Sequence, residues 1–209
     1  MRAFTTLAAP CEEEQVIKKS RFIGRLFPVA SEQEAQEKLA AIKKKHWDAS
    51  HNCSAFVLGQ RGELTRCSDD GEPQGTAGVP MLEALKRSGL SNVLAVVTRY
   101  FGGTLLGAGG LIRAYTGSVA RCIEVAKREE HRPVSVFGAE IPHKLWGKLG
   151  AQLASRGFLV RDVEYAQHVR FVIDAPVGRE EELRQLFLEL SGGQIEPVAQ
   201  GQQYIILPL

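Results

Sequence analysis

The sequence predicts an α+β protein with two domains, residues 1–130 and 131–209. In the second domain, strand and helix patterns alternate in the order βαββαβ, which is the ferredoxin-like split βαβ arrangement. The first domain mixes extended and helical patterns, and ten of the 21 glycines fall within residues 71–117. Residues 127–133 form a charged, proline-ended stretch between the two patterns, which predicts an inter-domain connection there.

Local patterns place the elements of the first domain. Ser31, followed three residues later by Glu34, forms a capping box that predicts a helix to about Lys45. The apolar run over residues 93–98 predicts a buried central strand, and apolar residues at helical spacing predict one long helix from Leu111 onwards. The other expected elements are two strands within residues 15–29, a hairpin of residues 54–58 and 64–67, a loop over 68–80 and a short helix over 81–87.

The second domain is placed by pattern alone. Its expected strands cover residues 134–141, 158–165, 168–175 and part of 203–207, and its helices cover 143–155 and 178–190.

Composition narrows the class of protein. The 209 residues carry a net charge of +2 and are 44% hydrophobic, which is typical of a globular protein and not of a disordered one. The first domain has 18 Lys and Arg against 15 Asp and Glu, so it allows an anionic partner without requiring one. No apolar run has the length of a membrane span or of a signal peptide, so we expect a soluble, cytoplasmic protein.

Neither a metal site nor a catalytic site has a clear signature. His51, Cys53 and Cys67 form the only grouping suggestive of zinc, and it lacks a second close ligand pair. The four cysteines show no disulfide framework. No GxSxG or HExxH motif occurs. We therefore expect no metal and no cofactor, assign no catalytic residue, and leave open whether the protein is an enzyme.

Two loops could carry function. The first holds three carboxylates, which could ligate Mg²⁺ or Ca²⁺ but also suit an ordinary exposed turn, the interpretation that we favour. Its residues are Ser68, Asp69, Asp70, Gly71 and Glu72.

The second loop links the buried strand to the long helix. Its glycines and the N–H groups of the helix start could bind an anion, its arginines could add charge, and its aromatic side chains could stack on bases. Equally, the glycines could only pack the helix against the sheet. The candidate anion- or nucleic-acid-binding residues are Arg99, Tyr100, Phe101, Gly102, Gly103, Gly107, Gly109, Gly110 and Arg113.

Six motifs occur in order over about a hundred residues: Lys19–Gly24, Ala49–Cys53, Ser68–Pro73, Gly75–Gly78, Val97–Gly103 and Leu106–Tyr115. Together they resemble the YigZ/IMPACT family. The resemblance implies an N-terminal domain with the β-α-β fold shared by a ribosomal protein, elongation factor G and GHMP kinases. It also implies a ferredoxin-like C-terminal domain similar to one near the end of elongation factor G. Eukaryotic relatives regulate translation under amino-acid stress, and no catalytic residues are established for the family.

Two functions follow as hypotheses. The first is a binding or regulatory protein that acts on RNA or on a component of the ribosome or the translation factors, through Arg99 and the glycine loop. The alternative is a small nucleotide- or phosphate-binding enzyme, in which the glycine loop holds phosphate and Asp69, Asp70 and Glu72 hold Mg²⁺. The oligomeric state stays open.

Overall fold

The computed structural model describes residues 1–209, which divide into two compact units. One unit comprises Met1–His131 together with Ile206–Leu209, and the other comprises Arg132–Ile205. The boundary falls within the stretch 127–133 that the sequence singles out as the connection, and most of that stretch belongs to the strand β7 (Arg128–Ile141). The reason is a distant partner: β1 (Phe4–Leu7) pairs antiparallel with the first residues of β7 and orders them as a strand.

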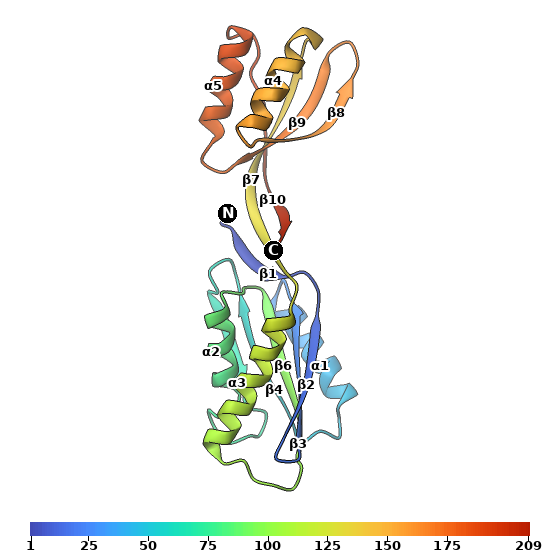
Figure 1. The fold of residues 1–209 in the computed structure, drawn as a ribbon, viewed down its shortest axis with the longest axis vertical. Helices are drawn as coiled ribbons and strands as arrows, with labels where there is room; N and C mark the ends of the chain where they lie inside the picture. The colour runs from blue at the N-terminus through green and yellow to red at the C-terminus, as the bar shows by residue number, and fades with distance from the viewer. The chain divides into compact units, whose positions relative to one another are not determined.

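The N-terminal unit is built on an antiparallel sheet with the strand order β2-β3-β6-β4-β5 (Figure 1). Helices α2 and α3 share a core with one face of the sheet, and α1 shares a core with the other face. The elements are β2 (Cys11–Ile17), β3 (Ser20–Pro28), α1 (Glu32–Lys45), β4 (His51–Leu58), β5 (Leu64–Ser68), α2 (Gly78–Ser88), β6 (Val93–Tyr100) and α3 (Ala108–Val125).

The central strand β6 is apolar along most of its length because helices cover both faces of the sheet at this strand. Val93, Ala95 and Val97 pack in the core beneath α2 and α3, whereas Leu94 and Val96 pack beneath α1. Because both faces are covered, the strand reads as a continuous apolar run. Arg99 and Tyr100, the last residues of β6, lie at the end of the sheet where the two candidate loops begin.

The capping box also forms as the sequence predicts. The Ser31 hydroxyl accepts a hydrogen bond from the Glu34 backbone N–H at 3.1 Å, and the Glu34 carboxylate accepts one from the Ala30 N–H at 2.7 Å. The first bond satisfies an N–H group that the first turn of α1 leaves free, and the second ties the residue before the N-cap to the helix.

The C-terminal unit has the ferredoxin-like strand order β10-β7-β9-β8. Helices α4 and α5 pack on one face of this sheet, around a core that includes Phe137, Leu153, Phe171 and Phe187. The remaining elements are α4 (His143–Ser155), β8 (Leu159–Tyr165), β9 (Val169–Pro176), α5 (Glu180–Ser191) and β10 (Val198–Pro208). No helix in either unit is long and apolar enough to cross a membrane.

Candidate functional site

The acidic loop is tied to the protein by each of its carboxylates. Asp69 accepts hydrogen bonds from the backbone N–H groups of Ala77 at 3.0 Å, Gly78 at 2.8 Å and Gly75 at 2.8 Å. Its carboxylate thus satisfies N–H groups at the start of α2, which explains why this helix begins three residues before the expected residue 81.

The same contacts set the ionisation of Asp69. Burial by itself would raise the pKa of this carboxyl, but the three N–H donors outweigh it and lower the pKa below the usual value. A carboxyl with a lowered folded-state pKa stabilises the fold above its unfolded-state pKa, and that contribution is lost as the pH falls through the folded-state pKa.

We therefore expect Asp69→Asn to lower the free energy of unfolding by about 1–3 kcal/mol at pH 7, because one amide group cannot accept all three bonds. Urea denaturation at pH 7 and near pH 3 measures this, and the difference from the wild type should shrink at the lower pH. Glu124→Gln, at an exposed position on α3, is the control and should change little. A difference that is independent of pH would contradict a role for the charge.

Asp70 is also engaged rather than free in solvent. Its carboxylate accepts a hydrogen bond from the Asn52 backbone N–H at 2.7 Å and pairs with the Lys43 ammonium at 2.5 Å. Its backbone oxygen lies 2.9 Å from Nδ1 of His51. The chain turns here, as the favoured interpretation has it, but the carboxylates are bonded to α1, β4 and the start of α2 rather than exposed to solvent alone.

Glu72 carries the loop into the core and meets Arg99 there. Its Oε1 accepts hydrogen bonds from Nη1 of Arg99 at 2.7 Å and from the Tyr115 hydroxyl at 2.6 Å. The Glu72 and Arg99 side chains are only 3% and 6% exposed, so this is a buried ion pair. Burial is the main cause that raises the pKa of Tyr115, which keeps that hydroxyl protonated and donating.

The rest of the Arg99 guanidinium has protein neighbours as well. Nη2 donates to the Ser20 hydroxyl at 3.3 Å, and the rings of Phe22 and Phe101 each lie 5.4 Å from Cζ. Nε is buried without a hydrogen-bond partner. Because Glu72 balances the charge of Arg99, a free cation for an anionic ligand has to come from other residues.

The residues suggestive of zinc have separate contacts. The Cys53 thiol is buried and donates to the Asp69 backbone oxygen at 3.0 Å, and burial raises its pKa to about 12. Cys67 is exposed, and His51 lies 3.8 Å from Oε2 of Glu72. No group of three or more His, Cys, Asp and Glu side chains is arranged to hold a metal ion.

The glycines between β6 and α3 have different roles. The Gly102 N–H donates to the Ser20 hydroxyl at 3.2 Å, and a Cβ at Gly102 would lie 2.0 Å from the Lys19 backbone oxygen. Gly103 and Gly107 have φ values of +79° and +75°, which favour glycine. Gly102 therefore presses this loop against the β2–β3 turn, and the other two allow the chain to enter α3.

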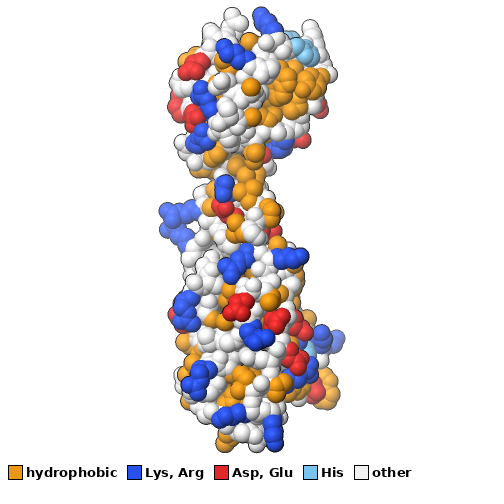
Figure 2. All heavy atoms as spheres, viewed as in Figure 1, with side chains coloured by type: hydrophobic (Ala, Val, Ile, Leu, Met, Phe, Trp, Pro, Cys, Tyr) orange, Lys and Arg blue, Asp and Glu red, His pale blue; other side chains and the backbone are white.

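Free cations lie beside this loop. A pocket of about 280 Å³ is lined by residues of the β2–β3 turn, the loop and α3: Ile17, Lys18, Leu106, Gly110, Arg113 and Ala114. Lys18, Lys19 and Arg113 are exposed, and none has a carboxylate partner. We call the pocket and these three cations the basic pocket. Basic side chains are visible at the end of the N-terminal unit that carries this loop (Figure 2).

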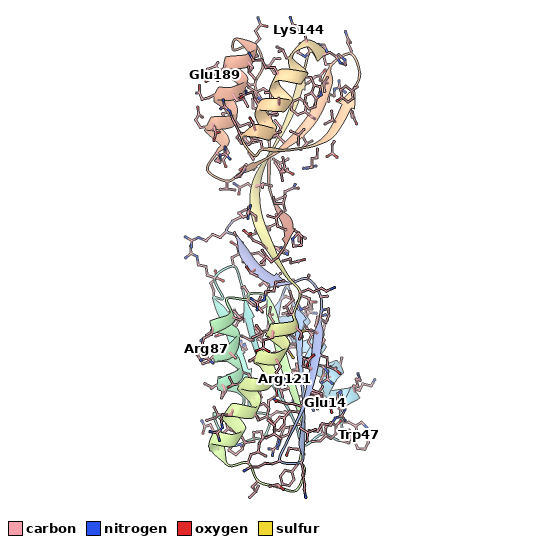
Figure 3. The ribbon with its side chains drawn as sticks, in the orientation of Figure 1. Glu14, Trp47, Arg87, Arg121, Lys144 and Glu189 are labelled. Atoms are coloured by element: carbon pink, nitrogen blue, oxygen red, sulfur yellow. The ribbon has the colours of Figure 1, made fainter.

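Exposed aromatic side chains occur on segments near the same strand end. Phe101 follows β6 and is 49% exposed, and Trp47 follows α1 and is 83% exposed. Tyr100 joins the two segments, because its hydroxyl lies 2.9 Å from Nδ1 of His46 and donates to Asp48 at 3.2 Å. Trp47 projects from the N-terminal unit (Figure 3). Sequence reasoning missed Trp47, although its place directly after Lys43–His46 was a signal.

The C-terminal unit presents the opposite charge. A pocket of about 510 Å³ on its sheet is lined by four carboxylates and by one cation, Arg170, which is paired with Glu140 at 2.9 Å. The four carboxylates belong to Glu140, Asp162, Glu164 and Glu196. This face is therefore a poor surface for a polyanion, and the basic pocket of the N-terminal unit is the better one.

Comparison with known proteins agrees with this division of the chain. The family described as "Impact N-terminal domain" matches residues 18–123, and a "Domain of unknown function (DUF1949)" matches residues 140–194. The IMPACT family member YvyE of Bacillus subtilis is 46% identical over 171 residues, which cover 82% of this chain and 79% of that protein. The chain belongs to the IMPACT family. The IMPACT family member YigZ of Escherichia coli is 33% identical over 202 residues, covering 95% of this chain and 98% of YigZ.

Solved structures include an IMPACT-like fold of the same extent. A crystal structure described as a hypothetical protein is 31% identical, covers 95% of this chain and 98% of its own, and superposes with a TM-score of 0.62. A structure of the two-domain translational regulator Yih1 is 27% identical and covers 56% of this chain and 46% of its own, with a TM-score of 0.34. The IMPACT N-terminal domain contains the acidic loop, the buried ion pair and the basic pocket.

Proposed function

We propose that this IMPACT family protein is a cytoplasmic regulatory protein that binds RNA, or an RNA surface of the translation machinery, through the basic pocket. The observation that carries the proposal is a pocket at the start of α3 lined by two exposed, unpaired cations, Lys18 and Arg113, with the exposed Lys19 next to Lys18 in the chain. Free N–H groups at the helix start add partial positive charge to the same place. The family resemblance to regulators of translation supports the choice of RNA.

The exposed aromatic rings fit the same ligand. Bases of single-stranded RNA stack on aromatic side chains, each contributing about 1–3 kcal/mol, while the backbone follows cations. Phe101 lies two residues after Arg99 and its ring packs on the guanidinium, so the buried ion pair holds this ring in place. In this proposal Arg99 positions Phe101 and does not itself bind phosphate.

The alternative, a phosphate-binding enzyme that uses Mg²⁺ on the acidic loop, has less support. Asp69 binds backbone N–H groups, Asp70 binds Lys43 and a backbone N–H, and Glu72 binds Arg99. A metal ion would have to displace these partners before it could use the carboxylates as ligands.

The test is RNA binding by a triple variant, Lys18→Gln, Lys19→Gln and Arg113→Gln. Fluorescence anisotropy with a single-stranded RNA at two salt concentrations measures it. We expect at least a tenfold loss of affinity at low salt. The slope of log K against the logarithm of the salt concentration should become less negative by about 2, because each lost phosphate contact removes about 0.7 from its magnitude.

A second triple variant, Arg61→Gln, Arg87→Gln and Lys127→Gln, removes the same charge from exposed positions elsewhere in the unit. It should retain most of the affinity of the wild type. Equal losses in the two variants would show only a general charge effect and contradict the basic pocket. Competition by a nucleotide with Mg²⁺, but not by RNA, would favour the enzyme alternative instead.

A further inference from the structure

Two cysteines that are distant in the sequence meet in the N-terminal unit. Cys11 lies in the edge strand β2, opposite Leu26 of β3, and Cys122 lies near the end of α3. The Cys11 thiol donates to the Cys122 backbone oxygen at 3.4 Å, across 111 positions of the chain. Gly24 of β3 leaves room for this approach, since a Cβ there would lie 3.0 Å from Sγ of Cys122.

The two thiols differ in access. Cys122 is fully buried in the core between α3 and the sheet, whereas Cys11 is partly exposed at its edge. A small oxidant can therefore reach Cys11 directly and reaches Cys122 only through it. We propose that Cys11 and Cys122 form a reversible disulfide when hydrogen peroxide oxidises the protein.

The ionisation of the pair is consistent with these roles. The hydrogen bond from the Cys122 side chain lowers the pKa of Cys11 to about 7, and the same contact, with burial, raises the pKa of Cys122. Cys11 is therefore the thiolate that attacks, and Cys122 keeps its proton until it resolves the product.

The reaction balances in two steps. The Cys11 thiolate attacks one oxygen of hydrogen peroxide, the O–O bond breaks, and Cys11 becomes a sulfenic acid while hydroxide leaves and takes up the proton that Cys11 had released. The Cys122 sulfur then attacks the Cys11 sulfur, the S–S bond forms, the S–O bond breaks, and water leaves with the Cys122 proton. One peroxide is reduced to two waters, and two thiols are oxidised to one disulfide.

The bond would link an edge strand to the helix that covers it. A disulfide that closes so long a loop restricts the unfolded chain strongly, so the oxidised protein should unfold at a higher temperature than the reduced one. Cys122 is near the end of α3, whereas the basic pocket is lined by the start of the same helix.

The experiment treats the full chain carrying Cys67→Ser with hydrogen peroxide and maps its peptides without reduction. Removing Cys67, the most exposed thiol, removes the main site for disulfides between molecules. We expect one cross-linked peptide pair containing Cys11 and Cys122, reversed by dithiothreitol, and a higher Tm before reversal. With Cys122→Ser added, Cys11 should accumulate as a sulfenic acid trapped by dimedone.

Cys53→Ser in the same background is the control, and it should leave the cross-link unchanged. The proposal is overturned if Cys11 remains free to react with N-ethylmaleimide after peroxide treatment. It is also overturned if Cys11 stops at the sulfenic or a higher oxidation state although Cys122 is present.

Discussion

Glu72→Ala is expected to lower the free energy of unfolding by about 3–5 kcal/mol, because it leaves the Arg99 guanidinium buried without a counter-charge. Both side chains are buried, so water cannot replace the lost carboxylate without opening the fold. The only other side-chain hydrogen bond of the guanidinium is to Ser20, at 3.3 Å. The Tyr115 hydroxyl loses its acceptor in the same change.

The comparison variant is Glu14→Ala, which removes a surface pair. Arg21 and Glu14 are paired at 2.8 Å, but their side chains are 50% and 44% exposed. Solvent screens a pair this exposed, so this variant should be nearly neutral. Urea denaturation followed by circular dichroism measures both variants, and equal small effects would show that the buried pair is not a structural tie.

A double variant separates a lost contact from an unpaired charge. Glu72→Met with Arg99→Met replaces both charges by apolar groups of similar length, and it should recover part of the stability that Glu72→Ala loses. The double variant should also release Phe101, since its ring packs on the guanidinium. Recovered stability together with weaker RNA binding would separate the structural role of the pair from its proposed positioning role.

Local signals in the sequence predicted the elements whose causes are local. The capping box of Ser31 and Glu34 gave the start of α1, and the apolar run from Val93 gave β6, since each depends on neighbours within a few positions. The ferredoxin-like order of the second domain is likewise a succession of local patterns. Pairing of β1 with β7 had no local signal, because it joins residues more than a hundred positions apart.

The candidate site depends on contacts between residues that are distant in the sequence. Motifs singled out both Glu72 and Arg99, but neither motif shows that they pair, because the partners are 27 positions apart and meet only in the folded core. The sequence predicted functional charge on both Arg99 and Arg113, whereas Arg99 is paired in the core and only Arg113 is exposed, as are Lys18 and Lys19. Exposure, which distinguishes Arg113 from Arg99, is a property of the packed fold and has no motif.

The second large effect is expected for Gly102→Ala. The new Cβ would lie 2.0 Å from the Lys19 oxygen and 2.5 Å from the Ser20 nitrogen, and both atoms belong to the backbone. No side chain can move aside, so the β2–β3 turn and the loop before α3 have to separate. Overpacking of this kind usually costs about 1–3 kcal/mol, and a clash with backbone lies at the upper end.

Gly109→Ala is the matched change seven residues along the same loop and helix start. A Cβ at Gly109 meets nothing within 4 Å, and replacing glycine by alanine at a helical position stabilises by about 0.4–1 kcal/mol because the unfolded chain has less freedom to lose. The unfolding temperature should therefore fall for Gly102→Ala and rise for Gly109→Ala. RNA binding should fall only for Gly102→Ala, because it displaces Lys18 and Lys19 from Arg113 across the basic pocket. If Gly102→Ala unfolds at a lower temperature but binds RNA as the wild type does, the close approach of turn and loop serves the fold alone and the basic pocket is not the contact surface.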